Sequence, residues 1–290
     1  MTAFSYAEMT ARNRGFVTEA EQERLRDARV FIPGIGGMGG AAFMALVRAG
    51  VGKFVIADID TFEVSNLNRQ LFCRADTIGE HKAKAAARLA LEINPELEIE
   101  VLQGEWTNSL DTILPRVAVA INGMDDAAAG AHLYRRCKVH GRTLIDAYAS
   151  PLPSVTVVRP EDPRLEERLG YPTLGVPWTE ITRHMAVECL MREIEYVLVH
   201  SSSHKYVDLE VAAEVAAGKR PRFSFSTMVT MSGTLMAEEA VRIVLNRPRG
   251  SDCRGYFLNA HAMKIERPLL APMAAVKGLL VRRFMKRMMA

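Results

Sequence analysis

The chain has 290 residues, of which 49% are hydrophobic and 24% are charged. It is long enough to bury a large core, as one α/β domain or as a domain with an insertion, and its composition is that of an ordinary globular protein. A net charge of +3 does not by itself indicate nucleic acid as a partner. No apolar run is long enough to cross a bilayer, and the N-terminal residues lack a signal-peptide core, so we expect a cytoplasmic protein.

Cysteine usage also limits the classes of protein. The cysteines are Cys73, Cys137, Cys189 and Cys253, and they are widely scattered with no CxxC pair. This spacing argues against a disulfide framework and against a zinc site built from two cysteine pairs, so we expect no structural zinc.

A short helix over Thr18–Asp27, with a capping box, precedes the first predicted strand, Val30–Pro33. A glycine cluster follows this strand and leads into a helix over Ala41–Arg48. Its candidate binding positions are Gly34, Gly36, Gly37 and Gly39. Strand, glycine turn and helix are typical of a nucleotide-binding unit, in which backbone N–H groups approach a phosphate at the helix N-terminus. Close packing of helix on strand is the competing explanation of such glycines.

The second predicted strand, Lys53–Ala57, ends at Asp58, where a carboxylate accepts hydrogen bonds from ribose hydroxyls. Beyond it comes a segment without a clear period that concentrates polar side chains: Asp60, Asn66, Arg69 and Gln70. A doubly wound sheet places its ligands at this edge, so we expect these residues at the site.

The next helix is predicted over Ala83–Ile93, with Lys82 at its first turn. A cation there opposes the helix dipole, which favours a role in binding an anion over a role in stability. A strand over Val117–Ile121 is followed by Asp125 and Asp126, and Asp126 suits the N-cap of a helix over Ala127–His140. Asp125 is then left as a candidate for chemistry.

We therefore predict a Rossmann-like, doubly wound α/β fold with a mainly parallel sheet, a helical insertion and a C-terminal helical tail. The predicted parts are a nucleotide-binding core over 1–158, an insertion for substrate recognition over 159–225, a return to the core over 226–271 and a basic tail over 272–290. Helices are expected over 182–198 and 207–217 in the insertion. The tail either docks on its own domain or lies on anionic lipid or a partner helix.

Two cations, a carboxylate at a strand end and a ribose-binding aspartate suit a nucleoside triphosphate better than a dinucleotide. Arg69 and Lys82 would stabilise the charge that builds on the phosphates when a carboxylate attacks the α-phosphorus. Asp125 would hold the Mg²⁺ that bridges the phosphates, because this hard ion prefers oxygen ligands.

These motifs, in this order and spacing, resemble those of the ThiF/MoeB/HesA family of ubiquitin-activating-enzyme-like adenylyltransferases. The resemblance rests on Gly34-x-Gly36-Gly37-x-Gly39, Asp58-x-Asp60, Ser65-Asn66-Leu67-x-Arg69-Gln70, Gly79-x-x-Lys82 and Gly123-x-Asp125. It implies ATP-dependent adenylation of a carboxylate, commonly the C-terminal glycine of a ubiquitin-like or sulfur-carrier protein.

The resemblance also implies roles for single residues. Asp58 matches the ribose-binding carboxylate, Asn66, Arg69 and Lys82 match polyphosphate-binding residues, and Asp125 matches the magnesium-associated catalytic carboxylate. Arg14 matches an arginine that reaches across a dimer interface into the partner's ATP site, which implies a homodimer.

Two departures from the family's pattern stand out. Asn122 occupies a position where an acidic residue is common. Cys189, the cysteine of the predicted insertion, lies in an apolar helical setting, whereas members that form a thioester or persulfide use a reactive cysteine. Three other functions remain open: an NAD-dependent dehydrogenase, a tRNA- or small-molecule-modifying dehydratase of the same family, and a non-catalytic nucleotide-binding regulator. Nucleic acid is not the expected partner.

Overall fold

The computed structural model describes residues 4–216, 219–220 and 222–289. Its centre is an eight-stranded sheet with the strand order β3-β2-β1-β4-β5-β6-β7-β8. Strands β1 to β5 pair in parallel, and β6 to β8 are added in antiparallel fashion. The strands are β1 (Arg29–Pro33), β2 (Lys53–Ala57), β3 (Glu98–Leu102), β4 (Val119–Ile121), β5 (Leu144–Asp146), β6 (Ser154–Val158), β7 (Tyr256–Asn259) and β8 (Lys264–Glu266).

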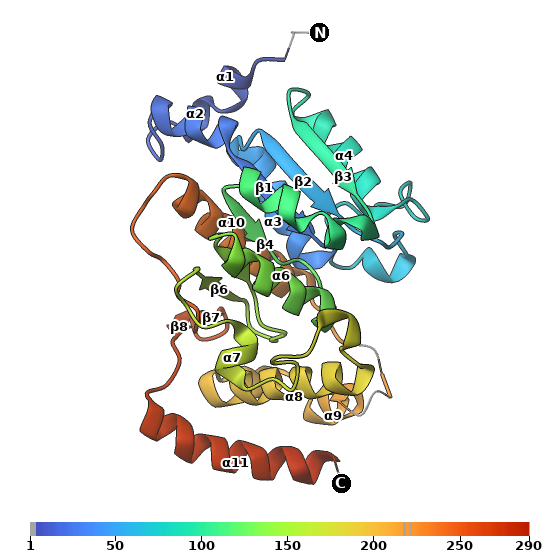
Figure 1. Ribbon diagram of the computed structural model, residues 1–290, viewed down its shortest axis with the longest axis vertical. Helices are drawn as coiled ribbons and strands as arrows, with labels where there is room; N and C mark the ends of the chain where they lie inside the picture. The colour runs from blue at the N-terminus through green and yellow to red at the C-terminus, as the bar shows by residue number, and fades with distance from the viewer. Residues whose placement is uncertain (1–3, 217–218, 221, 290) are drawn as a thin grey trace.

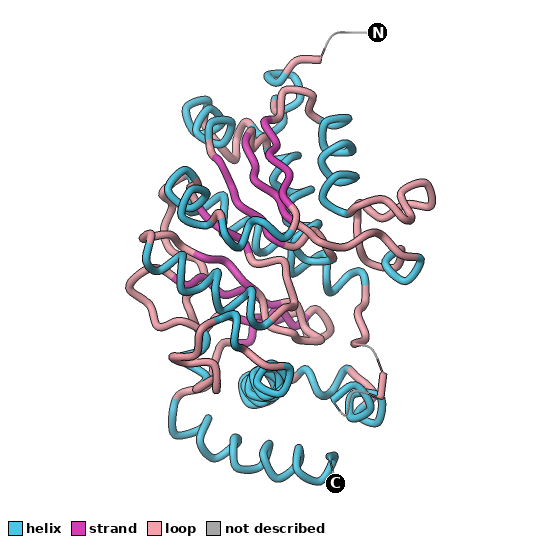
Figure 2. Tube along the Cα trace, turned by 45° about the vertical axis from the view of Figure 1, so that its right-hand side comes forward, coloured by secondary structure: helices cyan, strands magenta, loops and turns pink. Residues whose placement is uncertain are grey.

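Helices cover both faces of the sheet (Figure 2). Along β1, Val30 and Ile32 belong to the core beneath the helices α3 (Gly37–Ala49), α4 (Lys82–Ile93) and α10 (Ser226–Val244). Phe31 points to the other face, where it packs with residues of α5 (Leu110–Ile113) and α6 (Ala127–Val139). This alternation is the two-residue period of a strand buried on both faces.

The remaining elements lie around this core. They are α1 (Tyr6–Met9), α2 (Glu19–Asp27), α7 (Leu165–Leu169), α8 (Arg183–His200), α9 (Leu209–Ala216), α11 (Ala271–Met289) and the 3-10 turns η1 (Ala11–Asn13), η2 (Val64–Asn66), η3 (Gly104–Asn108), η4 (Leu114–Arg116), η5 (Trp178–Glu180) and η6 (Ser203–Tyr206). Helices α1 and α11 lie at opposite ends of the molecule (Figure 1). Helix α11 packs against α8 and α9. Among the described residues, no helix is long and apolar enough to cross a membrane.

The predicted fold class is confirmed, with differences at some boundaries. Helix α3 begins at Gly37 rather than Ala41, because the first glycines adopt helical backbone beneath α10. Strand β8 was not predicted; it is short and largely exposed, so its sequence carries little apolar signal. The expected helix over 207–217 is found as α9, and Ala217 lies outside the described residues.

Candidate functional site

The candidate site lies at the carboxyl ends of β1, β2 and β4. Strand β1 pairs with β2 on one side and with β4 on the other, so the order of the strands reverses at β1. Doubly wound sheets bind ligands at such a switch point, beyond the carboxyl ends of the strands. Two backbone hydrogen bonds hold the loops together there. Gly34 N donates to Ala57 O (2.7 Å), and Gly123 N donates to Pro33 O (2.9 Å).

The predicted glycines differ in what an added side chain would meet. A Cβ on Gly34 would lie 2.4 Å from the carbonyl carbon of Gly123, and Gly34 has a φ of +89°. A Cβ on Gly39 would lie 1.9 Å from Gly34 O, and one on Gly37 would lie 2.6 Å from Val229 Cγ1. Close packing therefore explains these three glycines.

Gly36 is the glycine that faces open space. The nearest atom to an added Cβ would be Gln70 Nε2 at 3.7 Å. Gly36 also caps α3 without a side-chain hydrogen bond, and the first turn of α3 holds no acidic residue. The free N–H groups of this turn form a place for an anion.

Asp58 joins the glycine loop to the end of β2. Its carboxylate accepts hydrogen bonds from Ile35 N (2.7 Å) and from Asp60 N (2.9 Å). Each oxygen keeps a second lone pair, so the same carboxylate retains capacity for ribose hydroxyls.

Lys82 begins α4, as its sequence position predicts, and only 9% of its side chain is exposed. Its Nζ lies 2.9 Å from Asp60 Oδ2, and its backbone N donates to Asp60 O (2.9 Å). Asp60 therefore compensates the buried ammonium group, so Asp60 contacts Lys82 rather than presenting a free carboxylate. Such a pair holds the Lys82 side chain near the end of β2.

Arg69 lies against the start of α3, where a Cβ on Gly37 would be 3.9 Å from Arg69 Cγ. Its guanidinium group donates to Ser65 O (2.9 Å) and to Asn68 Oδ1 (2.8 Å). The Cys73 thiol is affected by both cations. Burial raises its pKa, while the positive charges of Lys82 and Arg69 act to lower it. Both cations therefore act on the same buried thiol.

Two predicted amides have different surroundings. Asn66 Oδ1 accepts a hydrogen bond from Glu63 N (3.1 Å), which stabilises its own turn. Gln70 is buried, and its Oε1 has no hydrogen-bond partner among the described residues. Both ring nitrogens of His81, which precedes Lys82, are also buried without a partner within that part of the chain. Buried polar atoms normally have partners, so these atoms fit a polar ligand at this edge.

Asp125 lies in the loop after β4, and its side chain is exposed. The next residue, Asp126, accepts from Ala129 N (2.7 Å) and is the N-cap of α6, as predicted. No three His, Cys, Asp or Glu side chains within residues 4–216, 219–220 and 222–289 are grouped to hold a metal ion by themselves. Mg²⁺ often uses only one or two carboxylates together with substrate phosphates, so the uncommitted Asp125 carboxylate fits this ion.

Arg14 lies outside this cluster. Asn13, the preceding residue, donates to Gln22 Oε1 (2.9 Å) and to Ala49 O (3.1 Å), which fixes the segment at the C-terminal end of α3. The glycine loop lies at the other end of this 13-residue helix, about 20 Å away at 1.5 Å per residue. The Arg14 side chain is 65% exposed and forms an ion pair with Glu19. Arg14 therefore lies far from the site of its own chain.

Sequence reasoning missed a buried acidic group at the same edge. Asp146, the last residue of β5, accepts hydrogen bonds from Asn122 Nδ2 (3.0 Å) and Tyr134 OH (2.7 Å). Burial raises the pKa of Asp146 to about 6 and that of Glu193, on α8, to about 7. The position of Asp146 after a strand is a usable signal, whereas Tyr134 and Glu193 lie inside helices and carry none.

The hypothesis of a nucleophilic Cys189 is not supported by its surroundings. Cys189 is 4% exposed, and burial raises the pKa of its thiol to about 11. At neutral pH this thiol is protonated, and the thiolate is the reactive form.

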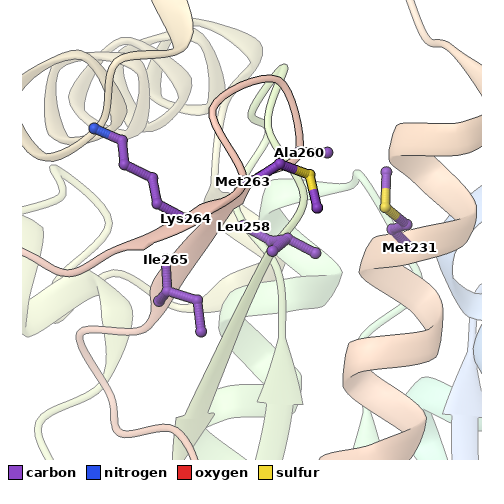
Figure 3. Close-up of a pocket in the computed structure, with 6 residues that line it drawn as sticks. All are labelled: Met231, Leu258, Ala260, Met263, Lys264 and Ile265. Atoms are coloured by element: carbon purple, nitrogen blue, oxygen red, sulfur yellow. The ribbon is translucent and has the colours of Figure 1, made fainter.

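An apolar pocket of about 370 Å³ lies between α10 and the β7–β8 hairpin (Figure 3). Met231 faces it from α10, two residues after the Val229 that covers Gly37. The other lining residues are Leu258, Ala260, Met263, Lys264 and Ile265. Met263 and Ile265 are 88% and 57% exposed, so the pocket continues onto an apolar surface.

The fold is of the doubly wound α/β class, and this edge is where that class binds its ligands. The chain belongs to the ThiF family, whose model matches residues 10–277. It is 32% identical over 129 residues to the sulfur carrier protein ThiS adenylyltransferase of Escherichia coli, covering 44% of this chain and 51% of that protein. It is 45% identical over 86 residues to the molybdopterin-synthase adenylyltransferase of Salmonella typhimurium, covering 30% and 34%. The chain thus spans about half, or less, of these relatives.

Solved structures share the fold. E. coli MccB with ATP superposes with a TM-score of 0.61 at 16% identity, covering 86% of this chain and 65% of that chain. The E. coli tRNA N6-threonylcarbamoyladenosine dehydratase, TcdA, superposes with a TM-score of 0.57 at 20% identity, covering 83% and 95%.

Proposed function

We propose that this protein is an ATP-dependent adenylyltransferase that activates a carboxylate as an acyl adenylate. The carboxylate oxygen forms a bond to the α-phosphorus of ATP, the bond to the bridging oxygen breaks, and pyrophosphate leaves. The observation that carries the proposal is that Asp58 and Arg69 lie at the open N-terminal turn of α3, with Lys82 linked to Asp58 through Asp60. The named functions of its ThiF-family relatives support it.

Each side chain has a role that fits its surroundings. Asp58 would hold the ribose, and Arg69 and Lys82 would stabilise charge on the phosphates and the departing pyrophosphate. Gly36 and Gln70 would contact the nucleotide beside the first turn of α3. When bound, Mg²⁺ would neutralise phosphate charge, with Asp125 as its protein ligand.

The acceptor is the less defined partner. The apolar pocket between α10 and the β7–β8 hairpin has an exposed rim, which suits a protein or peptide better than a small polar acid. We propose the C-terminal carboxylate of a ubiquitin-like or sulfur-carrier protein or peptide, in line with the names of the similar adenylyltransferases.

ATP–pyrophosphate exchange tests the reaction. Purified protein would be incubated with ATP, Mg²⁺, labelled pyrophosphate and carrier proteins or peptides ending in glycine, and the products would be analysed by mass spectrometry. The expected result is exchange that requires a free C-terminal carboxylate, together with an adenylated acceptor. Binding of ATP without exchange for any acceptor would favour the regulatory function, and NAD binding in place of ATP would favour the dehydrogenase.

We also propose that Arg14 completes the ATP site of a second copy. It is anchored about 20 Å from its own glycine loop and its side chain is exposed, which leaves it available to the site of a second copy. A mixing experiment tests this. Arg14→Ala and Lys82→Ala would each be inactive alone, but half of randomly mixed dimers would carry one intact site, giving about a quarter of wild-type activity. No recovery on mixing would contradict the proposal.

The outer face of α11 is a further contact surface. Its inner face packs on α8 and α9, but the outer face exposes a stripe of apolar side chains, each more than a third exposed: Met273, Val276, Leu279, Leu280 and Phe284. Residues 271–289 contain no acidic residue, and Arg283 and Lys286 are exposed. We propose that this face lies on an anionic lipid surface, because apolar contact and basic charge together favour it.

Vesicle sedimentation tests this contact. We expect binding to phosphatidylcholine vesicles that contain phosphatidylglycerol, a loss of binding in 0.5 M salt, and a loss in the L279E/L280E variant. Equal binding to uncharged vesicles, or no binding to anionic ones, would contradict the proposal.

A further inference from the structure

The loop that carries Asp125 is held by Asn122, the residue that departs from the family's pattern. Asn122 is 8% exposed, and its backbone N donates to Ile145 O (2.8 Å). Its Oδ1 accepts a hydrogen bond from Met124 N (3.2 Å), directly before Asp125. The Asn122 side chain therefore fixes the backbone of the turn from which Asp125 projects.

The orientation of the Asn122 amide depends on what faces its other end. Asn122 Nδ2 donates to Asp146 Oδ2 (3.0 Å). An amide has a donor end and an acceptor end, so an acceptor opposite Nδ2 keeps Oδ1 turned toward Met124 N. If Asp146 were replaced by a donor, the amide would lose this constraint.

Other donors fix Asp146 as that acceptor. Tyr134 OH, from α6, donates to Asp146 Oδ2 (2.7 Å), and Ala147 N donates to Asp146 Oδ1 (2.7 Å). Together with Asn122 Nδ2, three donors from three segments converge on one carboxylate. This arrangement satisfies an ionised carboxylate, which accepts only.

We propose that Asn122 and Asp146 are a pair of positioning residues that hold the Gly123–Asp125 loop and thereby aim the Asp125 carboxylate at the nucleotide. This inference rests on the proposed adenylation function. Neither side chain is proposed to touch substrate. Groups that orient a catalytic residue in this way typically change activity by 10- to 100-fold when they are replaced.

An exchange of the two side chains tests the pair. N122D places a second carboxylate against Asp146, and we expect about a 30-fold loss of kcat with the KM for ATP within about threefold. D146N removes the fixed acceptor, and we expect about a tenfold loss. In N122D/D146N the new carboxylate at position 122 accepts from Met124 N and from the new amide at position 146. We expect kcat within about threefold of wild type.

A matched control is E239Q. Glu239, on α10, is also a buried carboxylate that accepts a backbone hydrogen bond, from Ser251 N (2.9 Å), but it does not contact this loop. We expect its kcat within about twofold of wild type. Two results together would overturn the positioning role. The double variant would be no more active than either single variant, and the kcat of N122D, D146N, N122D/D146N and E239Q would fall in step with the thermal midpoint of each protein.

A second readout separates this proposal from the proposed function. Amide hydrogen exchange at Met124 reports the loop without any turnover. We expect faster exchange in D146N than in wild type and recovery in the double variant. If wild type fails to adenylate any acceptor but this pattern appears, the function is wrong and the pairing holds. If exchange at Met124 is unchanged in D146N, the pairing is wrong.

Discussion

The two halves of the carboxyl edge of the sheet differ in how their charged side chains are stabilised. In the β1–β2 half, Lys82 is paired with Asp60 at 2.9 Å and Asp58 is bonded to backbone N–H groups. In the β4–β5 half, Asp146 is buried and Glu193 is half-buried, and desolvation raises the pKa of both. In the first half, the charged side chains are paired or hydrogen-bonded and lie near the open N-terminus of α3. In the second half, the acids accept hydrogen bonds from backbone N–H groups.

The glycine loop gives the largest expected effect, because it joins the two halves. Gly39→Ala would place a Cβ 1.9 Å from Gly34 O, which the backbone must move to avoid, and we expect a loss of about 3 kcal/mol or more in the free energy of unfolding. Gly36→Ala, at the position with open space, is expected to keep cooperative unfolding and to weaken ATP binding. Chemical denaturation and ATP titration measure both, and equal destabilisation by the two variants would contradict this division.

Removal of charged side chains at the candidate site should affect chemistry more than stability. We expect Arg69→Ala and Asp125→Ala each to reduce ATP–pyrophosphate exchange by about 100-fold or more, because each removes a preorganised electrostatic contact. Lys84→Ala is the control, since Lys84 is exposed on the same helix as Lys82. Exchange within tenfold of wild type in Arg69→Ala or Asp125→Ala would contradict the assigned role.

The acids of the β4–β5 half should produce a pH-dependent effect of a few kcal/mol on stability. Glu193 accepts from Ala149 N (2.5 Å), and burial raises its pKa from 4.5 to about 7. The charge of Asp146 also raises the pKa of Glu193, whereas the charges of Arg222 and Arg168 lower it. Tyr171 lies nearby. Because the folded state holds this proton more tightly than the unfolded chain, its stabilisation is complete below about pH 4.5 and is lost as the pH rises toward 7.

Glu193→Gln isolates this effect, because the amide oxygen still accepts the bond from Ala149 N. We expect the variant to match wild type at pH 4 and to exceed it by about 1–3 kcal/mol at pH 8, at about 1.4 kcal/mol per pKa unit. Urea unfolding at both pH values measures the difference. A variant that is less stable than wild type at pH 8 would show that the charged carboxylate is compensated.

The smallest expected effect concerns Cys189. Its thiol is buried with a pKa of about 11, so Cys189→Ser should leave the exchange rate within about twofold of wild type, and the folded protein should resist alkylation at this position at neutral pH. Mass spectrometry after iodoacetamide treatment locates any modification. A thioester or persulfide at Cys189 during turnover would overturn this prediction.

Much of the β1–β2 half of the site can be predicted from sequence because its residues follow one another along the chain. Asp58 directly follows a buried strand, and Lys82 begins a clear helix, so their places at the edge follow from strand and helix signals alone. The function of single glycines could not be read in this way. Gly37 and Gly39 are required by contacts with Val229 and Gly34, and only the fold brings these atoms together.

The sequence alone determined where the strands, the glycine turn and the capped helices lie along the chain, because each depends on neighbours within a few positions. Tertiary structure decided which side chains meet. Asn122, Tyr134 and Asp146 come from the loop after β4, a helix and a strand, and their hydrogen bonds exist only after the sheet and α6 have packed. It also decided that Arg14 lies far from its own glycine loop and that Cys189 is buried, because both depend on how distant segments pack.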